Sequence, residues 1–165
     1  MKSRPSLSVA QVGGLLGTPA MTVVMYMLAP VLGIRTDIVA MLAEVLGGWK
    51  MGLLVHILDG AVIFPAVFVF LFYRLLPGAA IVRGVAFGLV LWLTSQALVM
   101  PMMGAGFFSA HIGGLRATMA SLLGHVVYGG LLGLVCMVQF MAQDDASGRS
   151  IPVGTLTPGA EPKAR

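Results

Sequence analysis

Four long apolar stretches are the feature of this 165-residue chain that most limits how it can fold. They lie near residues 9–33, 49–73, 84–103 and 117–142, and a helix needs about 20 apolar residues to cross the hydrocarbon core of a bilayer. Only 10% of the residues are charged, whereas a soluble domain carries about 25%. The sequence therefore predicts an all-α integral membrane four-helix bundle in contact with the lipid bilayer.

The segments outside the four spans predict two further elements. Apolar residues at 38, 41, 42 and 45 form one stripe, which predicts an interfacial helix over residues 36–46 with Thr36 as its N-cap. Residues 143–165 contain several prolines and two aspartates, and they predict a disordered tail. The transmembrane domain is therefore expected to span residues 1–142.

Lysine and arginine residues predict the orientation of the bundle. With four spans, the N-terminus, the second loop and the C-terminus share one side of the membrane. That side carries Lys2, Arg4, Arg74, Arg83, Arg149, Lys163 and Arg165, whereas the other carries Arg35, Lys50 and Arg116. Because basic residues favour the cytoplasmic side, both termini are expected in the cytoplasm.

The two halves of the chain resemble each other. An offset of 71 carries Gly13, Gly17, Pro30 and Gly33 onto Gly84, Gly88, Pro101 and Gly104, and an offset of 69 carries His56 and Gly60 onto His125 and Gly129. This pattern predicts two tandem two-helix repeats. Parallel repeats are related by an axis along the membrane normal, so His56 and His125 should lie at similar depth and face each other across that axis.

Ionisable side chains within the spans are the candidate site residues, because such groups are costly in a bilayer and should face the interior of the bundle. They are His56, Asp59 and His125, with Tyr128 and Gln96 as polar companions. Three interpretations remain open. The first is a buried polar network that includes Asp59, Tyr128 and Gln96. The second is a b-type haem with His56 and His125 as axial ligands. The third is a proton or ion path through Asp59.

Other functional classes are excluded or disfavoured by the sequence. The basic residues form no patch, so no nucleic-acid partner is expected. The single cysteine, Cys136, cannot form an intrachain disulfide or a thiolate metal cage, and no metal site is predicted. Met100, Met102, Met103 and His111 are acceptable Cu(I) ligands, but packing is the expected role of these methionines.

The glycine, histidine and tryptophan positions also carry a resemblance to a known family. These positions include Gly48-Trp49, His56, Gly60, Gly84, Gly88, Trp92, the run 100–104 and the run 124–129. Over residues 15–133 the chain resembles an uncharacterised family of small four-helix bacterial membrane proteins with no assigned function. The resemblance implies the four-span fold and a bacterial inner-membrane location, but no activity. Asp59 stands where an apolar residue is more usual in that family.

The expected function follows from what the chain lacks. No nucleotide-binding, metalloprotease or serine-hydrolase motif is present, and no segment is predicted to form a soluble domain. We therefore expect a non-enzymatic membrane protein that acts as an accessory or structural subunit of a membrane complex, through a membrane-protein partner or a homo-oligomer. The alternatives are a small bis-histidine haem protein that transfers electrons, and a transporter of ions or small solutes.

Overall fold

The structure is a computed structural model that describes residues 4–34 and 37–148. Four helical segments in it are long and apolar enough to cross a membrane: Leu7–Leu32, Trp49–Leu75, Ala80–Met102 and Leu115–Ala146. The first is helix α1 and the last is helix α8. The described residues form no strand. The predicted all-α membrane bundle is therefore confirmed.

The second and third spans are interrupted by π-helical turns. The second span consists of α3 (Trp49–Leu58), η1 (Asp59–Ile63), α4 (Phe64–Val67), η2 (Phe68–Phe72) and α5 (Tyr73–Leu75). The third consists of α6 (Ala80–Thr94), η3 (Ser95–Val99) and α7 (Met100–Met102).

Prolines account for the position of two of these turns, η1 and η3. Pro65 and Pro101 each follow a π-turn, and proline has no N–H to donate to the helix. The residue before each proline donates its N–H five residues back, from Phe64 to the carbonyl of Asp59 and from Met100 to that of Ser95. Each π-turn therefore leaves a carbonyl without its usual helical donor.

The ends of two predicted elements differ from the structure. The short helix α2 spans Ile38–Leu46, and its N-cap is Asp37, whose Oδ1 accepts the N–H of Ala40 at 3.0 Å. Thr36, the predicted cap, lies outside the described residues. Helix α8 continues to Ala146, so residues 143–146 are helical, contrary to the predicted start of the tail at 143. The rest of the predicted tail, from residue 149, lies outside the described residues.

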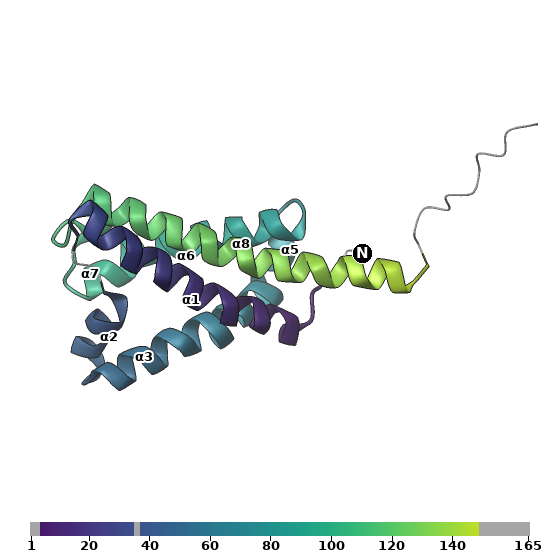
Figure 1. Ribbon diagram of the computed structural model, residues 1–165, viewed down its shortest axis with the longest axis horizontal. Helices are drawn as coiled ribbons and strands as arrows, with labels where there is room; N and C mark the ends of the chain where they lie inside the picture. The colour runs from purple at the N-terminus through teal and green to yellow at the C-terminus, as the bar shows by residue number, and fades with distance from the viewer. Residues whose placement is uncertain (1–3, 35–36, 149–165) are drawn as a thin grey trace, which may run out of the picture.

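Helices α1, α6 and α8 lie side by side, whereas α3 diverges from them toward the end that carries α2 (Figure 1). The close contacts require glycine. A Cβ atom on Gly84 of α6 would lie 2.6 Å from the Cα atom of Gly133 in α8, and one on Gly14 of α1 would lie 2.5 Å from Cγ of Pro65. The contact at Gly14 is where the second span meets α1 before α3 turns away.

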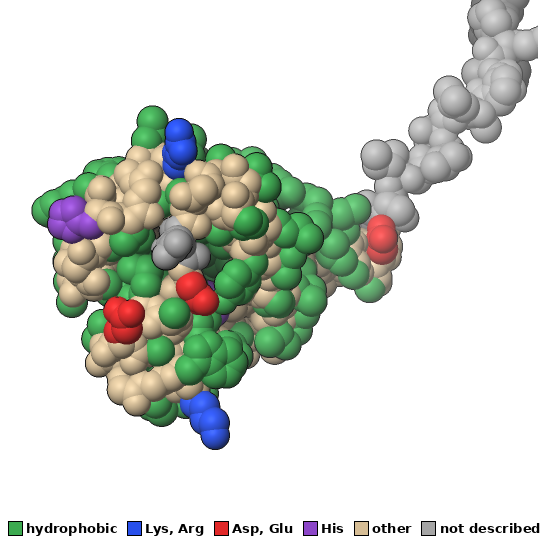
Figure 2. Space-filling view, turned by 60° about the vertical axis from the view of Figure 1, so that its left-hand side comes forward, with side chains coloured by type: hydrophobic (Ala, Val, Ile, Leu, Met, Phe, Trp, Pro, Cys, Tyr) green, Lys and Arg blue, Asp and Glu red, His purple; other side chains and the backbone are tan. Residues whose placement is uncertain are grey.

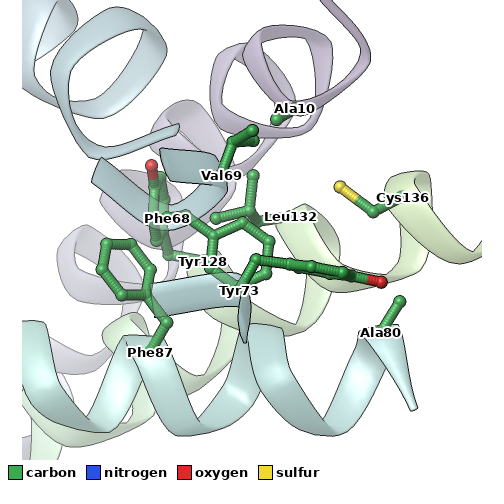
Figure 3. Packing of buried hydrophobic residues seen from close by; sticks show 9 residues of the cluster. All are labelled: Ala10, Phe68, Val69, Tyr73, Ala80, Phe87, Tyr128, Leu132 and Cys136. Atoms are coloured by element: carbon green, nitrogen blue, oxygen red, sulfur yellow. The ribbon is translucent and has the colours of Figure 1, made fainter. Parts of the chain in front are cut away.

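The largest cluster of buried apolar side chains lies toward the end of the bundle where α1 begins and α8 ends. Figure 3 shows its members, which come from the four spans: Ala10, Phe68, Val69, Tyr73, Ala80, Phe87, Tyr128, Leu132 and Cys136. The rings of Phe68 and Phe87 contact each other with their planes tilted by 41° and their centroids 5.2 Å apart. This end is therefore tightly packed.

The outer surface of the bundle suits lipid. Large apolar side chains such as Met27, Leu75 and Met102 are each more than two-thirds exposed. Figure 2 shows apolar side chains along the body of the molecule, with the visible charged side chains gathered near its two ends. A soluble protein rarely exposes so much contiguous apolar surface, so the distribution fits a membrane protein.

The two predicted repeats do not pack equivalently. Under a two-fold axis, the matched glycines of α1 and α6 would contact different helices. Instead both contact α8: a Cβ atom on Gly13 would lie 3.0 Å from Cα of Leu132, and one on Gly88 would lie 3.3 Å from Cα of Gly129. The duplication stays a prediction.

Candidate functional site

A cavity of about 330 Å³ lies in the half of the bundle where α3 diverges. Its walls come from every span and from α2, and they are mostly apolar. The lining residues are Thr18, Met21, Met25, Ile38, Leu42, His56, Asp59, Gly60, Phe64, Leu91, Thr94, Ser95, Gln96, Val99, Met100, Ser109, Ala117, Ser121, His125 and Tyr128. The cavity therefore brings together all five polar residues selected from the sequence: His56, Asp59, Gln96, His125 and Tyr128.

His125 is held by the backbone of its own helix. Its Nδ1 atom lies 2.8 Å from the carbonyl oxygen of Ser121, one turn earlier in α8. A carbonyl oxygen can only accept, so Nδ1 carries the proton and donates it. The neutral ring then has a lone pair on Nε2, for which the described residues supply no hydrogen-bond partner.

His56 is held by a different contact, to helix α1. Its Nε2 atom lies 3.0 Å from Oγ1 of Thr22, whose hydroxyl donates to the carbonyl of Thr18 at 2.8 Å. Because the hydroxyl proton is used in that bond, Nε2 of His56 donates to Thr22 and Nδ1 keeps the lone pair. The two imidazole rings therefore line one cavity, and each is held by its own hydrogen bond.

Gln96 connects the third span to α8 and to the loop before it. It is 1% exposed, its Oε1 accepts from the hydroxyl of Ser109 at 2.8 Å, and its Nε2 donates to Oγ of Ser121 at 3.2 Å. The backbone of Phe108 and Ser109 has positive φ values of 49° and 56°, which non-glycine residues adopt at a cost. The bond from Ser109 to Gln96 helps to hold that loop against the cavity.

Tyr128 satisfies the carbonyl that the first π-turn releases. In a regular helix Gly60 would accept from Phe64, but Phe64 donates to Asp59. The Tyr128 hydroxyl donates to the oxygen of Gly60 instead, at 2.7 Å. The carboxyl group of Asp59 has no hydrogen bond to the described residues, although Asp59 lines the cavity.

Sequence reasoning missed the immediate partners of both histidines. Residues three apart share one face of a helix, as His56 and Asp59 do and as His125 and Tyr128 do, but neither pair is bonded through its side chains in the structure. In the structure, His56 bonds to Thr22 of another helix, and His125 bonds one turn back to Ser121. The second contact is to a backbone carbonyl, which any residue four before the histidine would offer, and nothing in the sequence indicates the first.

The structure also separates the methionine and histidine candidates near the third span. Met100 is buried and lines the cavity, whereas Met102 is 76% exposed. His111 is exposed outside the cavity, with Nδ1 3.0 Å from the carbonyl oxygen of Gly104. In the part of the chain that the structure describes, no three His, Cys, Asp or Glu side chains are placed to share a metal ion.

Comparison with known proteins identifies a family but no function. A family of unknown function (DUF6789) matches residues 5–146, which include every residue that lines the cavity. No curated protein and no solved structure matches the chain. The geometry of the cavity is therefore the observation from which a function has to be argued.

Proposed function

The chain belongs to a family of unknown function (DUF6789), and from that premise we propose that it is a non-enzymatic membrane protein that binds a small lipid-soluble molecule inside the bundle. The cavity of about 330 Å³ carries this proposal. Mostly apolar pockets with a few convergent polar groups are the usual form of a small-molecule site, and they begin at about 300 Å³.

The free-energy cost of placing ionisable groups in a membrane supports ligand binding as the role of these side chains. Ionisable side chains in a span cost several kcal/mol unless they find partners. A purely structural network would use these groups internally, but the Asp59 carboxyl group has no hydrogen bond within the described residues and each histidine keeps one free nitrogen. A bound molecule would supply the missing partners. Presenting that molecule to a membrane complex is the accessory role that fits a chain of this size.

The wider setting of the proposal rests on the sequence. We propose a bacterial inner-membrane location, with both termini in the cytoplasm and the α2 end on the opposite side. On this orientation the packed core faces the cytoplasmic half of the membrane and the cavity the outer half. A second copy of the chain or another membrane protein would contact the exposed apolar faces.

Filling the cavity tests the proposal. Leu91 lines the cavity, whereas Leu93, on the same helix, is 51% exposed. Wild type, Leu91→Trp and the control Leu93→Trp are purified in lipid nanodiscs, and the small molecules extracted from each are compared by mass spectrometry. We expect a co-purifying compound near one per chain in wild type and control, and its loss in Leu91→Trp. An identical extract from all three folded proteins would contradict the proposal.

The visible absorption spectrum of the same samples tests the haem alternative. His125 has a free Nε2 atom, as an axial ligand needs, but Nε2 of His56 is used in its bond to Thr22. We therefore expect no Soret band. A Soret band that disappears in both His56→Ala and His125→Ala would replace the proposal with haem binding.

A further inference from the structure

Some hydrogen-bonding groups around the cavity already have partners within the protein, and others do not. Most donors are occupied within the protein: the hydroxyls of Tyr128, Thr18 and Thr94 donate to backbone carbonyls, and Gln96 donates to Ser121. The Ser109 hydroxyl donates to Gln96. A molecule in the cavity therefore meets few free donors.

Apart from the second amide hydrogen of Gln96, which has no acceptor among the described residues, the free groups are acceptors. They are Nε2 of His125, Nδ1 of His56 and the carboxyl group of Asp59, each without a hydrogen-bond partner among residues 4–34 and 37–148. The hydroxyls of Ser95 and Ser121 also line the cavity and can act in either sense. Three acceptors from three side chains, one of them an acid, thus point to a ligand that brings donors.

The rest of the cavity lining is apolar, and it indicates what the remaining part of the ligand should be. The short helix α2 contributes Ile38 and Leu42, and α1 contributes Met21 and Met25, so the walls beside the acceptors are apolar and flexible in shape. A metal ion would leave these walls without a partner, and no three acidic, histidine or cysteine side chains of the described residues lie close enough to share one.

From this arrangement, and resting on the proposed function, we propose that the cavity takes a lipid-soluble primary amine. Its ammonium group has three donors and no acceptor, which matches Asp59, His56 and His125. Its hydrocarbon part would lie along the methionines of α1 and the apolar face of α2. A carbonyl compound of the same size would bring an acceptor to a set of acceptors and leave them all unsatisfied.

Matched probes test the ligand class. Decylamine, 1-decanol and 2-decanone share chain length and differ in the group that they present. Each is titrated into the full chain in nanodiscs, and binding is measured by native mass spectrometry. We expect decylamine to bind at least about tenfold more tightly than 2-decanone, with 1-decanol between them. Asp59→Asn should weaken decylamine binding about tenfold and leave 1-decanol nearly unchanged. The control Glu44→Gln removes an exposed acid outside the cavity and should change neither.

The outcomes separate this inference from the proposed function. Equal binding of all three probes, or preference for 2-decanone, overturns the amine assignment while the Leu91→Trp result still stands. Binding of Ag⁺ in place of decylamine, lost in Met21→Leu, also overturns it, in favour of a soft metal ion. Failure of every probe, together with an unchanged extract from Leu91→Trp, overturns the proposed function itself.

Discussion

At the scale of single residues, the Tyr128 hydroxyl has a defined structural task. It donates to the Gly60 carbonyl at 2.7 Å, in a buried contact between α8 and the first π-turn. The proline-induced π-turn leaves that carbonyl without a helical N–H donor. A buried carbonyl without a donor costs free energy, so this contact stabilises both the π-turn and the position of α8 against it.

Removing that hydroxyl tests the contact. Tyr128→Phe should lower the free energy of unfolding by about 1–3 kcal/mol, because the Gly60 carbonyl loses its donor. Thermal unfolding in detergent, followed by circular dichroism, measures the change. Tyr26→Phe is the control, since Tyr26 is half exposed on α1 and its substitution should change stability by less than about 0.5 kcal/mol. Equal effects of the two substitutions would argue against a structural task for the Tyr128 hydroxyl.

Sequence reasoning selected the right polar residues for the cavity but not their bonds. Ionisable groups are rare inside spans, so His56, Asp59 and His125 stand out by type alone. Which atom bonds to which depends on rotation and tilt of neighbouring helices. The contact of His56 to Thr22 crosses between two spans, and no spacing along the chain records it.

At the scale of elements, the approach of α6 and α8 depends on paired glycines. A Cβ atom on Gly84 would lie 2.6 Å from Cα of Gly133, which no side chain rotation can relieve because the contacted atom is backbone. Small residues four apart allow membrane helices to pack this closely. Such spacing is visible in the sequence at Gly84 and Gly88 and at Gly129 and Gly133, but the identity of the partner helix is not.

Substitution by alanine tests that approach with a matched control. Gly84→Ala should separate the two helices and lower the free energy of unfolding by about 1–3 kcal/mol. In Gly130→Ala the new Cβ atom would have its nearest neighbour at 3.9 Å, so stability should hold or rise slightly. The comparison is made by unfolding in detergent at matched protein concentration. A destabilisation of similar size in both variants would mean that the close contact is not what Gly84 provides.

The π-turns were not predictable from the sequence. Prolines in the second and third spans signal a local defect in the helix, but that defect can be a kink, a helix end or a π-turn. At Pro101 the helix continues through the proline to Met102. The choice between these outcomes depends on tertiary partners such as Tyr128, which become visible only in three dimensions.

At the scale of the whole molecule, one end of the bundle is packed and the other is hollow. The buried cluster around Phe68 and Leu132 occupies the end where both described chain ends lie, and the N–H of Ser6 donates to Gln139 there at 3.1 Å. At the opposite end α3 diverges, and α2 contacts it there (Figure 1). Hydropathy predicted the number of spans, but it could not predict this asymmetry, because hydropathy does not record how closely helices pack.

The membrane orientation proposed from the lysine and arginine residues can be checked directly. Cys136 is buried, so replacing it by serine gives a background in which a new cysteine reports on its own position. In that background, Ala110→Cys at the exposed loop before α8 should react with a membrane-impermeant maleimide added to intact cells. Ser147→Cys, after α8, should react only once the cells are opened. The reverse pattern would invert the orientation proposed from the arginines and lysines.

Because one end of the bundle is packed and the other is hollow, the residues that stabilise the fold are largely different from those that line the cavity. Of the nine residues in the largest buried cluster, only Tyr128 also lines the cavity. Changes at wall positions such as Ile38 or Leu42, which do not pack against that cluster, therefore leave it untouched. We therefore expect the sequences of relatives to vary more around the cavity than in the buried cluster, which an alignment of the family would check.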